Sequence, residues 1–248
     1  MSSPAQAAPT EPTTNAGSQS ATAKVDNKTR VTDSLLLLAI ALSQPFLGCV
    51  YYAIYGGAQN GGPAAMRYAS MLVHEFIALA ALAWILKRQG RNFRNIGCAW
   101  SLVDIWSSMW ICVAAVLASF TGYCFLQLIS KVVLGHYLQL QRVDYFSGGA
   151  LLGAIVLTVV NPWFEELIVR GFVMTETTAL TAKPWVAIVF STVLQASYHL
   201  YQGWVNAVRV GLIFLVFSLF FAKRGRILPL VLAHFYIDAY ALARYVQP

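Results

Sequence analysis

Six ionisable side chains stand inside apolar stretches towards the C-terminus, where charge is least expected: Glu165, Glu166, Arg170, His199, His234 and Asp238. A charged side chain at the centre of a bilayer costs about 2.5–3.5 kcal/mol on insertion scales, so each one needs a structural or functional reason. Carboxylates and imidazoles placed together can hold a water molecule and remove its proton. The grouping therefore predicts a hydrolytic site inside a membrane.

The segment Glu165-Glu166-x-x-x-Arg170 divides its charges between two faces of a helix. At about 100° per residue, Glu166 and Arg170 share one face, and Glu165 points away from them. We expect Glu166 and Arg170 to form an internal ion pair, because a buried charge needs a partner. Glu165 then has no local partner and is free for chemistry. The alternative is a helix end whose charges meet water.

Lys183-Pro184 marks a turn between two helices. In an antiparallel hairpin closed by this turn, Glu165 and His199 each lie about 22 Å from it, at about 1.5 Å per residue. Equal height predicts that the two side chains meet and hold a water molecule between them. The alternative is a hydrogen-bonded core histidine.

His234 and Asp238 are four residues apart and share a helix face. We expect Asp238 to orient the imidazole, and His234 to donate a hydrogen bond to a developing oxyanion. The alternative is a buried pair that only locks the helix.

Apolar runs of roughly 20 residues, each long enough to cross a bilayer as a helix, recur from Ser34 onwards. They predict an all-α polytopic transmembrane bundle of seven or eight helices. Residues 1–30, rich in Ala, Ser, Thr and Pro, are expected to form a disordered tail. Residues 31–248 are expected to form a single membrane domain, with 149–245 as its catalytic core. The predicted crossings are 34–55, 68–86, 103–130, 149–180, 184–203, 207–222 and 227–245.

The composition supports a membrane protein and argues against a nucleic-acid partner. Of the 248 residues, 58% are hydrophobic and 11% charged, whereas soluble domains carry about 25% charged residues. The formal charge is +7, but the basic residues cluster at the ends of apolar runs and form no aromatic-interleaved stripe. The four cysteines have no CxxC spacing and are expected to be packing residues.

Basic residues in short loops predict the orientation. The segments 87–94 and 223–226 carry the densest clusters, and Lys24, Lys28 and Arg30 precede the first crossing on the same side. The positive-inside rule then gives a multi-pass integral membrane protein with a cytoplasmic N-terminus and its C-terminus across the membrane. In a bacterium this would be the inner membrane.

The ordered set Glu165-Glu166-x-x-x-Arg170-Gly171, His199 and His234-x-x-x-Asp238 resembles the CPBP family, which includes the CAAX prenyl endoproteases and the Abi-type bacterial proteins. The resemblance covers about 149–245. It implies an intramembrane endopeptidase in which Glu165 and His199 activate water, His234 and Asp238 bind the oxyanion, and Glu166 and Arg170 are structural. The implied partners are membrane lipid and a substrate, either a prenylated protein C-terminus or a small peptide such as a bacteriocin precursor.

Two positions depart from the family pattern. Gln195 stands where the second motif, FxxxH, has Phe, and this affects the packing around His199. Asp238 stands where the family usually has Asn. Because an anionic Asp cannot donate a hydrogen bond, Asp238 must be protonated or act through His234.

A metal-free glutamate mechanism is preferred to zinc catalysis, and no cofactor is expected. Zinc would use His199, His234 and Glu165 as its ligands. His74-Glu75 is not followed by a second histidine at the HExxH spacing, where Ala78 stands, and neither residue is assigned a role. Two other functions stay open. One is a proton-coupled transporter, which the absence of internal repeats disfavours; the other is an inactive scaffold or immunity factor.

Overall fold

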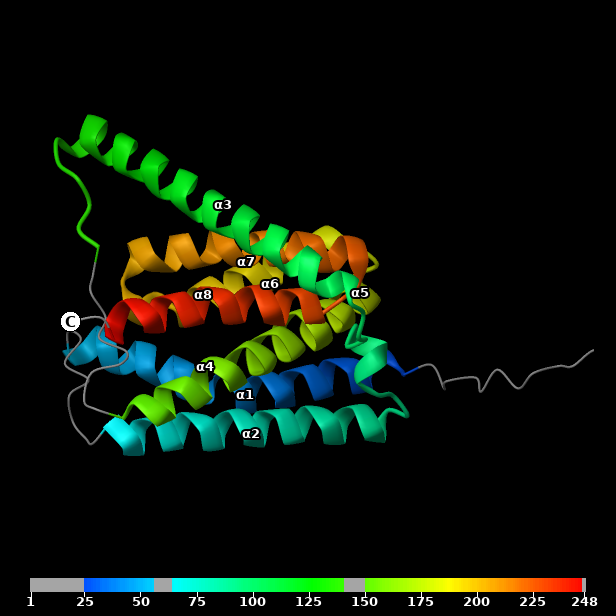
Figure 1. Ribbon diagram of the computed structural model, residues 1–248. Helices are drawn as coiled ribbons and strands as arrows, with labels where there is room; N and C mark the ends of the chain where they lie inside the picture. Colours follow the sequence, from blue (N-terminus) through cyan, green and yellow to red (C-terminus); the bar gives the residue numbers. More distant parts are fainter. Residues whose placement is uncertain (1–24, 56–63, 141–149, 247–248) are drawn as a thin grey trace, which may run out of the picture.

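The computed structural model describes residues 25–55, 64–140 and 150–246, and these residues form helices and turns with no strand among them (Figure 1). The prediction of an all-α bundle is confirmed. The elements are α1 (Asn27–Tyr55), α2 (Ala64–Arg88), the 3-10 helix η1 (Phe93–Ile96), α3 (Val103–Leu134), α4 (Leu151–Glu165), the π-helix η2 (Glu166–Met174), α5 (Thr175–Thr181), α6 (Pro184–Tyr198), the 3-10 helix η3 (Leu200–Gln202), α7 (Trp204–Arg224) and α8 (Leu228–Val246).

Elements α4, η2 and α5 follow one another without a break, so the described chain forms seven helical rods that match the seven predicted crossings closely. Five of them are long and apolar enough to span a membrane: α1, α2, α3, α7 and the continuous rod 151–181. The chain is therefore a multi-pass integral membrane protein. The rods α6 and α8 fall outside this set of five, and α6 has only 15 residues.

The first helix begins earlier than its apolar run. The Asp26 side chain accepts hydrogen bonds from the backbone N–H of Thr29 at 3.0 Å and from its hydroxyl at 2.6 Å, which caps the first turn. These hydrogen bonds lower the pKa of the exposed Asp26 carboxyl. Residues 27–30, expected to belong to the tail, are thus helical, whereas 1–24 lie outside the described residues.

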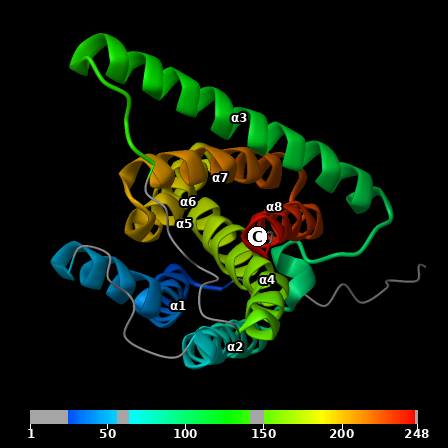
Figure 2. The ribbon, with the colours of Figure 1, turned by 60° about the vertical axis from the view of Figure 1, so that its left-hand side comes forward.

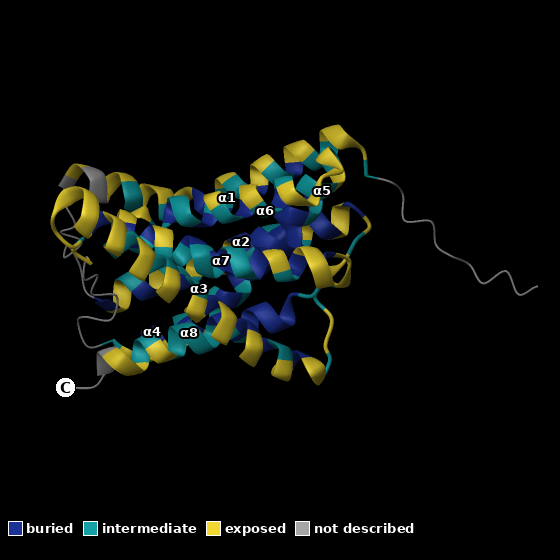
Figure 3. Ribbon diagram, turned by 90° about the horizontal axis from the view of Figure 1, so that it is seen from above, coloured by how far each residue is buried: buried dark blue, intermediate teal, exposed yellow. Residues whose placement is uncertain are grey.

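The rod 151–181 occupies the centre of the bundle. It packs against α2 and α8 through α4, and against α6 through η2, while α3 packs on α7 and α8. Towards its C-terminal end α3 diverges from the rest, as the views in Figures 1 and 2 both show. Buried residues gather in the half of the bundle next to α5 (Figure 3), so the core surrounds η2.

The two basic loops lie at the same end of the bundle. Ile227 donates its N–H to the carbonyl of Gly97 at 3.0 Å, and Arg226 pairs with the buried Asp104 at 2.6 Å. At this end Glu176 of α5 also contacts Arg30, at 2.6 Å, and Arg91. The arrangement agrees with the predicted grouping of basic segments on one side.

Candidate active site

The carboxylate motif lies at the junction of α4 and the π-helix η2, not in a continuous α-helix as the sequence analysis assumed. Pro162 lacks a backbone N–H and so removes one donor from the turn before the junction. All nine residues of η2 are buried. Helical turns of this wider kind are frequent at functional sites, and apolar periodicity alone does not distinguish them from α-helix.

Gly171 lets η2 approach the loop between α2 and α3. A Cβ atom at this position would lie 3.1 Å from the carbonyl oxygen of Ile96 and 3.3 Å from its Cδ1 atom. Only a residue without a side chain fits there without displacing the loop. The Ile227 side chain also lies next to this position, so Gly171 is level with the start of α8, and residues 172–181 extend beyond it.

Glu166 is shared between two partners. One carboxylate oxygen lies 3.4 Å from Nε of Arg170, and the other lies 3.0 Å from Nδ1 of His234. Both Glu166 and Arg170 are completely buried. The structure thus contains the ion pair that the four-residue spacing predicts. It also gives Glu166 a contact with α8 that the spacing could not show.

His234 lies between two carboxylates. Its Nδ1 faces Glu166, and its Nε2 lies 3.6 Å from an oxygen of Asp238, which is half-buried. The expectation that Asp238 orients this imidazole is therefore incomplete, because Glu166 makes the closer contact. Both ring nitrogens can donate in this arrangement.

Arg170 is held by contacts from two other helices. Its Nη1 donates to the side-chain oxygen of Gln195 at 2.5 Å, and its guanidinium carbon lies 4.3 Å from the ring centroid of Phe214. A cation above an aromatic ring is attracted by the ring's quadrupole. Within the described part of the chain, Nε and Nη2 of Arg170 have no hydrogen-bond partner.

Gln195, whose role the sequence did not reveal, joins the motif on η2 to Glu165. Its side chain is fully buried; it accepts from Arg170 and donates from Nε2 to a carboxylate oxygen of Glu165. The side chain of Tyr198 also hydrogen-bonds to Glu165. Glu165 therefore has hydrogen-bond partners on α6. The sequence analysis considered only its own helix, where it expected no partner for this carboxylate. The sequence did contain one signal for this role: Gln195 is a polar residue in an apolar segment, one helical turn before His199.

Among the described residues, His199 has a hydrogen bond at only one of its two ring nitrogens. Its Nδ1 lies 2.8 Å from the backbone carbonyl of Gln195. Since a carbonyl can only accept, Nδ1 carries the proton, and Nε2 of the neutral ring keeps its lone pair. The half-buried His199 ring lies 5.8 Å from the Phe214 ring, and that of His234 lies 5.3 Å from it. Gln195 thus contacts Glu165 through its side chain and His199 through its backbone.

The paired residues His74 and Glu75 of α2 have different surroundings. His74 Nε2 lies 3.0 Å from the carbonyl of Ala41, and its ring meets Phe164 edge-on at 6.1 Å, so it packs α2 against α1 and α4. Glu75 is buried, and its carboxyl group lies within electrostatic range of Glu165, His234 and Asp238. The sequence analysis gave neither residue a role.

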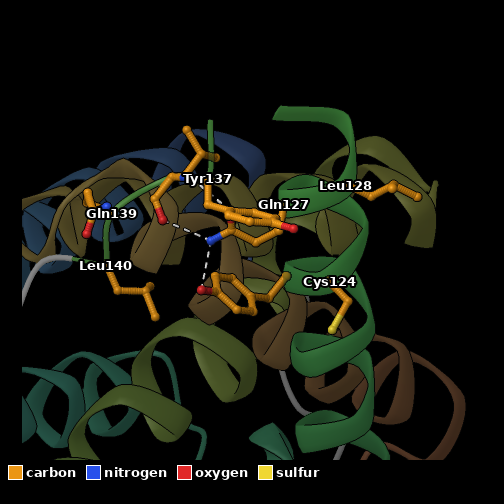
Figure 4. Close-up of a pocket in the computed structure, with 8 residues that line it drawn as sticks. Cys124, Gln127, Leu128, Tyr137, Gln139 and Leu140 are labelled. Carbon is orange, nitrogen blue, oxygen red and sulfur yellow. Dashed lines mark hydrogen bonds between the residues drawn. The ribbon is translucent and has the colours of Figure 1, made fainter. Parts of the chain in front are cut away.

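A cavity of about 680 Å³ lies elsewhere, between the C-terminal half of α3 and the chain that follows it (Figure 4). The Gln127 amide closes one side by donating to the Tyr123 hydroxyl at 2.7 Å and to the Leu138 carbonyl at 2.9 Å. The acidic and histidine residues of the candidate site do not line it. The cavity is therefore separate from the carboxylate and histidine group.

The donors of the candidate site do not fit a zinc ion as they stand. Both nitrogens of His234 face carboxylate oxygens, and the Gln195 amide occupies an oxygen of Glu165. Among the described residues, no group of three or more His, Cys, Asp and Glu side chains could hold a metal. A catalytic zinc needs three such ligands, so no reaction step is assigned to a metal here.

The fold and this group define an all-helical membrane protein with a buried carboxylate and histidine site. Residues 147–240 match a family model described as type II CAAX prenyl endopeptidase Rce1-like. The match contains all the motif residues and confirms the resemblance to the CPBP family over this part of the chain. The comparisons with curated proteins and with solved structures gave no match. Helices α1, α2 and α3 lie outside the matched segment.

Proposed function

We propose that this protein is an intramembrane endopeptidase that hydrolyses peptide bonds with a water molecule activated by Glu165 and His199. The observation that carries the proposal is that Gln195 contacts both residues, which come from different helices. Equal height in the hairpin predicts that Glu165 and His199 themselves meet around one water molecule. The match over residues 147–240 supports the same class of reaction.

The reaction follows from the chemistry of each group. The lone pair on Nε2 of His199 accepts a hydrogen bond from the water, and Glu165 takes the proton as the water oxygen bonds to the carbonyl carbon. The carbonyl oxygen gains the displaced electron pair, and the Nε2–H of His234, which is 3.6 Å from Asp238 and so not in a hydrogen bond with it, stabilises the oxygen by donating to it. When the C–N bond breaks, the leaving nitrogen takes the proton from Glu165. The two products are a carboxylate and an amine.

The proposed substrates are membrane-associated peptides, either the prenylated C-termini of CAAX proteins or small peptides such as bacteriocin precursors. The description of the matched family supports the first class. The site lies in the half of the bundle that ends in the basic loops, since Gly171, one turn from Glu166, contacts Ile96 and Ile227. A peptide entering from that side, next to the lipid, has the shorter path.

The proposal includes seven membrane crossings within one membrane domain, whose catalytic core is 149–245. The rod α6 has only 15 residues and ends just before His199, and α8 carries His234, Asp238 and Arg244, which lower its apolar character. The basic loops face the cytoplasm together with the N-terminus, in the inner membrane if the host is a bacterium.

Cleavage by the purified protein tests the proposal. The protein in detergent is incubated with a peptide ending in a farnesylated CAAX sequence and with the same peptide without the farnesyl group, and mass spectrometry identifies the products. Hydrolysis by the wild-type chain and none by Glu165→Gln is the expected result. Absence of cleavage in both proteins, or equal cleavage by both, contradicts the endopeptidase and leaves the transporter and the inactive scaffold.

A further inference from the structure

Glu75 is a buried carboxyl group contributed by a helix outside the segment that matches the family. It belongs to α2 and is 3% exposed. Within the described part of the chain, its Oε2 atom has no hydrogen-bond partner. An unsatisfied buried polar atom is costly, typically about 1–3 kcal/mol, so its retention indicates a partner that arrives from outside the protein.

The neighbours of Glu75 are those of the candidate active site. Its carboxyl group lies within electrostatic range of Glu165, Asp238 and His234, which come from two other helices. The adjacent residue, His74, contacts the ring of Phe164, which directly precedes Glu165. The turn of α2 that carries Glu75 thus lies at the level of Glu165.

The two cationic side chains of the candidate site, Arg170 and His234, are paired with carboxylates other than Glu75. Arg170 is in contact with Glu166, and His234 lies between Glu166 and Asp238. A buried carboxylate with no cation in contact is much less stable than the neutral acid. Glu75 is therefore held with its proton, and a protonated carboxyl group is a hydrogen-bond donor.

We propose that Glu75 is a further catalytic residue, whose protonated carboxyl group donates a hydrogen bond to the carbonyl oxygen of the scissile peptide bond. The inference rests on the proposed endopeptidase. As the water oxygen bonds to the carbonyl carbon, negative charge grows on the oxygen that accepts this hydrogen bond. The proton stays on Glu75 throughout, and the proton released by the water goes to Glu165 and then to the leaving nitrogen. An ionised Asp238 cannot supply such a donor, so α2 provides one.

Paired substitutions separate this role from a structural one. Glu75→Gln keeps an N–H donor of similar shape and should retain most of kcat. Glu75→Leu removes the donor and should lower kcat by about 10²–10³-fold, as loss of one oxyanion donor does in other hydrolases, with little change in KM. His74→Gln, one residue away on the same helix and outside the site, is the matched control and should keep the wild-type kcat. Melting curves in detergent verify that each variant is folded.

Three results would overturn the inference while leaving the endopeptidase intact. In the first, Glu75→Leu cleaves as fast as the wild type, so the group does not act in the reaction. In the second, Glu75→Gln is as slow as Glu75→Leu, so a negative charge or a transferred proton is needed instead of a donor. In the third, KM rises and kcat is unchanged, so Glu75 acts in binding alone. Failure of the wild-type chain to cleave, by contrast, counts against the proposed function itself.

Infrared spectroscopy tests the protonated state without any hydrolysis. The difference spectrum of the wild-type protein and Glu75→Gln at neutral pH should contain the C=O stretching band of one carboxylic acid. That band should shift on transfer to D₂O. If the substitution instead removes the two stretching bands of a carboxylate, Glu75 is ionised in the wild-type protein, and this contradicts a donor role.

Discussion

At the scale of single residues, two adjacent carboxylates have different environments. Glu166 is completely buried and contacts Arg170 and His234, whereas Glu165 receives hydrogen bonds from neutral side chains on α6. A carboxylate paired with a cation is stabilised in its charged form and is a poor base. A carboxylate whose partners are neutral keeps more of its basicity. In the proposed mechanism these contacts favour a structural role for Glu166 and leave the chemistry to Glu165.

Glutamine at each of these two positions should damage different properties. Glu166→Gln leaves Arg170 buried beside a neutral side chain and should lower the free energy of unfolding by about 3–5 kcal/mol, as breaking a buried pair does. Glu165→Gln keeps its shape and neutral partners, so it should melt close to the wild-type protein and lose hydrolysis. Melting curves in detergent and turnover are measured for both. If the two variants lose the same property, the division of roles is wrong.

Gln195 should prove essential to the geometry of the site. Gln195→Leu removes the acceptor of Arg170 and the donor to Glu165 while keeping similar volume, so we expect a loss of about 1–3 kcal/mol in stability and a lower kcat. Gln195→Glu keeps the acceptor and places a carboxylate beside Glu165; it should therefore be more stable than the Leu variant at acidic pH only. Wild-type stability and activity in Gln195→Leu would show that these hydrogen bonds are not needed.

The purified protein should contain no stoichiometric zinc, since Glu165 and His199 hold water directly in the proposed mechanism. Elemental analysis before and after chelator treatment gives the zinc content per chain, and hydrolysis is assayed at each stage. Chelation should leave activity unchanged. One tightly bound zinc per chain, with activity lost on its removal and restored on its return, would favour the metalloprotease interpretation.

The motif residues could be predicted from the sequence because charge inside an apolar helix is conspicuous and spacing of four places side chains on one face. The partners of these residues could not. Gln195 and Glu75 become meaningful only once α6 and α2 are packed against the rod 151–181. Sequence spacing within one helix carries no information on which side chains of other helices it meets, and this is why the second contact of Glu166 was also missed.

At the scale of elements, the helix bounds followed from apolar run length, but the local geometry at the motif did not. The predicted crossing 149–180 is a rod from 151 to 181, yet nine of its residues, 166–174, form the π-helix η2. A π-helix differs from an α-helix in its hydrogen-bond pattern, which apolar run length does not report. The close approach of Gly171 to Ile96 is a tertiary contact that no run length can show.

Gly171→Ala should destabilise the protein through that contact. The added methyl group would meet the carbonyl oxygen of Ile96 at 3.1 Å, and that oxygen belongs to backbone that cannot rotate away. Overpacking of this kind costs about 1–3 kcal/mol. The melting temperature of the variant in detergent is compared with that of Gly211→Ala. Among the described residues, the one close neighbour of a Cβ atom at Gly211 is the Ala196 methyl group at 3.2 Å. Equal melting of Gly171→Ala and the wild type would show that the η2 and η1 regions are not tightly packed.

At the scale of the whole molecule, the basic residues gather at one end of the bundle, and so do several buried carboxylates. Asp33, Asp104 and Glu176 each contact an arginine there. The loop after α2 and the turn before α8 are joined directly by the hydrogen bond between Ile227 and Gly97. These contacts fix both basic segments on the same side of any membrane that the bundle crosses. The positive-inside rule then decides which side that is.

Cysteine labelling in intact cells decides the orientation. Gly90 and Gly225 have φ angles of +66° and +62°, so a cysteine there would be strained. The exposed Ala99 and Ala222, next to the two basic segments, are better sites. Gln139 is exposed in the segment that follows α3 and reports on the other side. The C-terminal end of α3 lies at the opposite end of the bundle from α5 (Figure 1). The four native cysteines are all free and are first replaced by serine.

With a membrane-impermeant maleimide added outside the cells, we expect Gln139→Cys to react, and Ala99→Cys and Ala222→Cys to react only after lysis. Reaction of the latter two in intact cells would invert the topology and place the entrance to the site on the outer face. Reaction of only one of them would contradict the packing of the two basic segments itself.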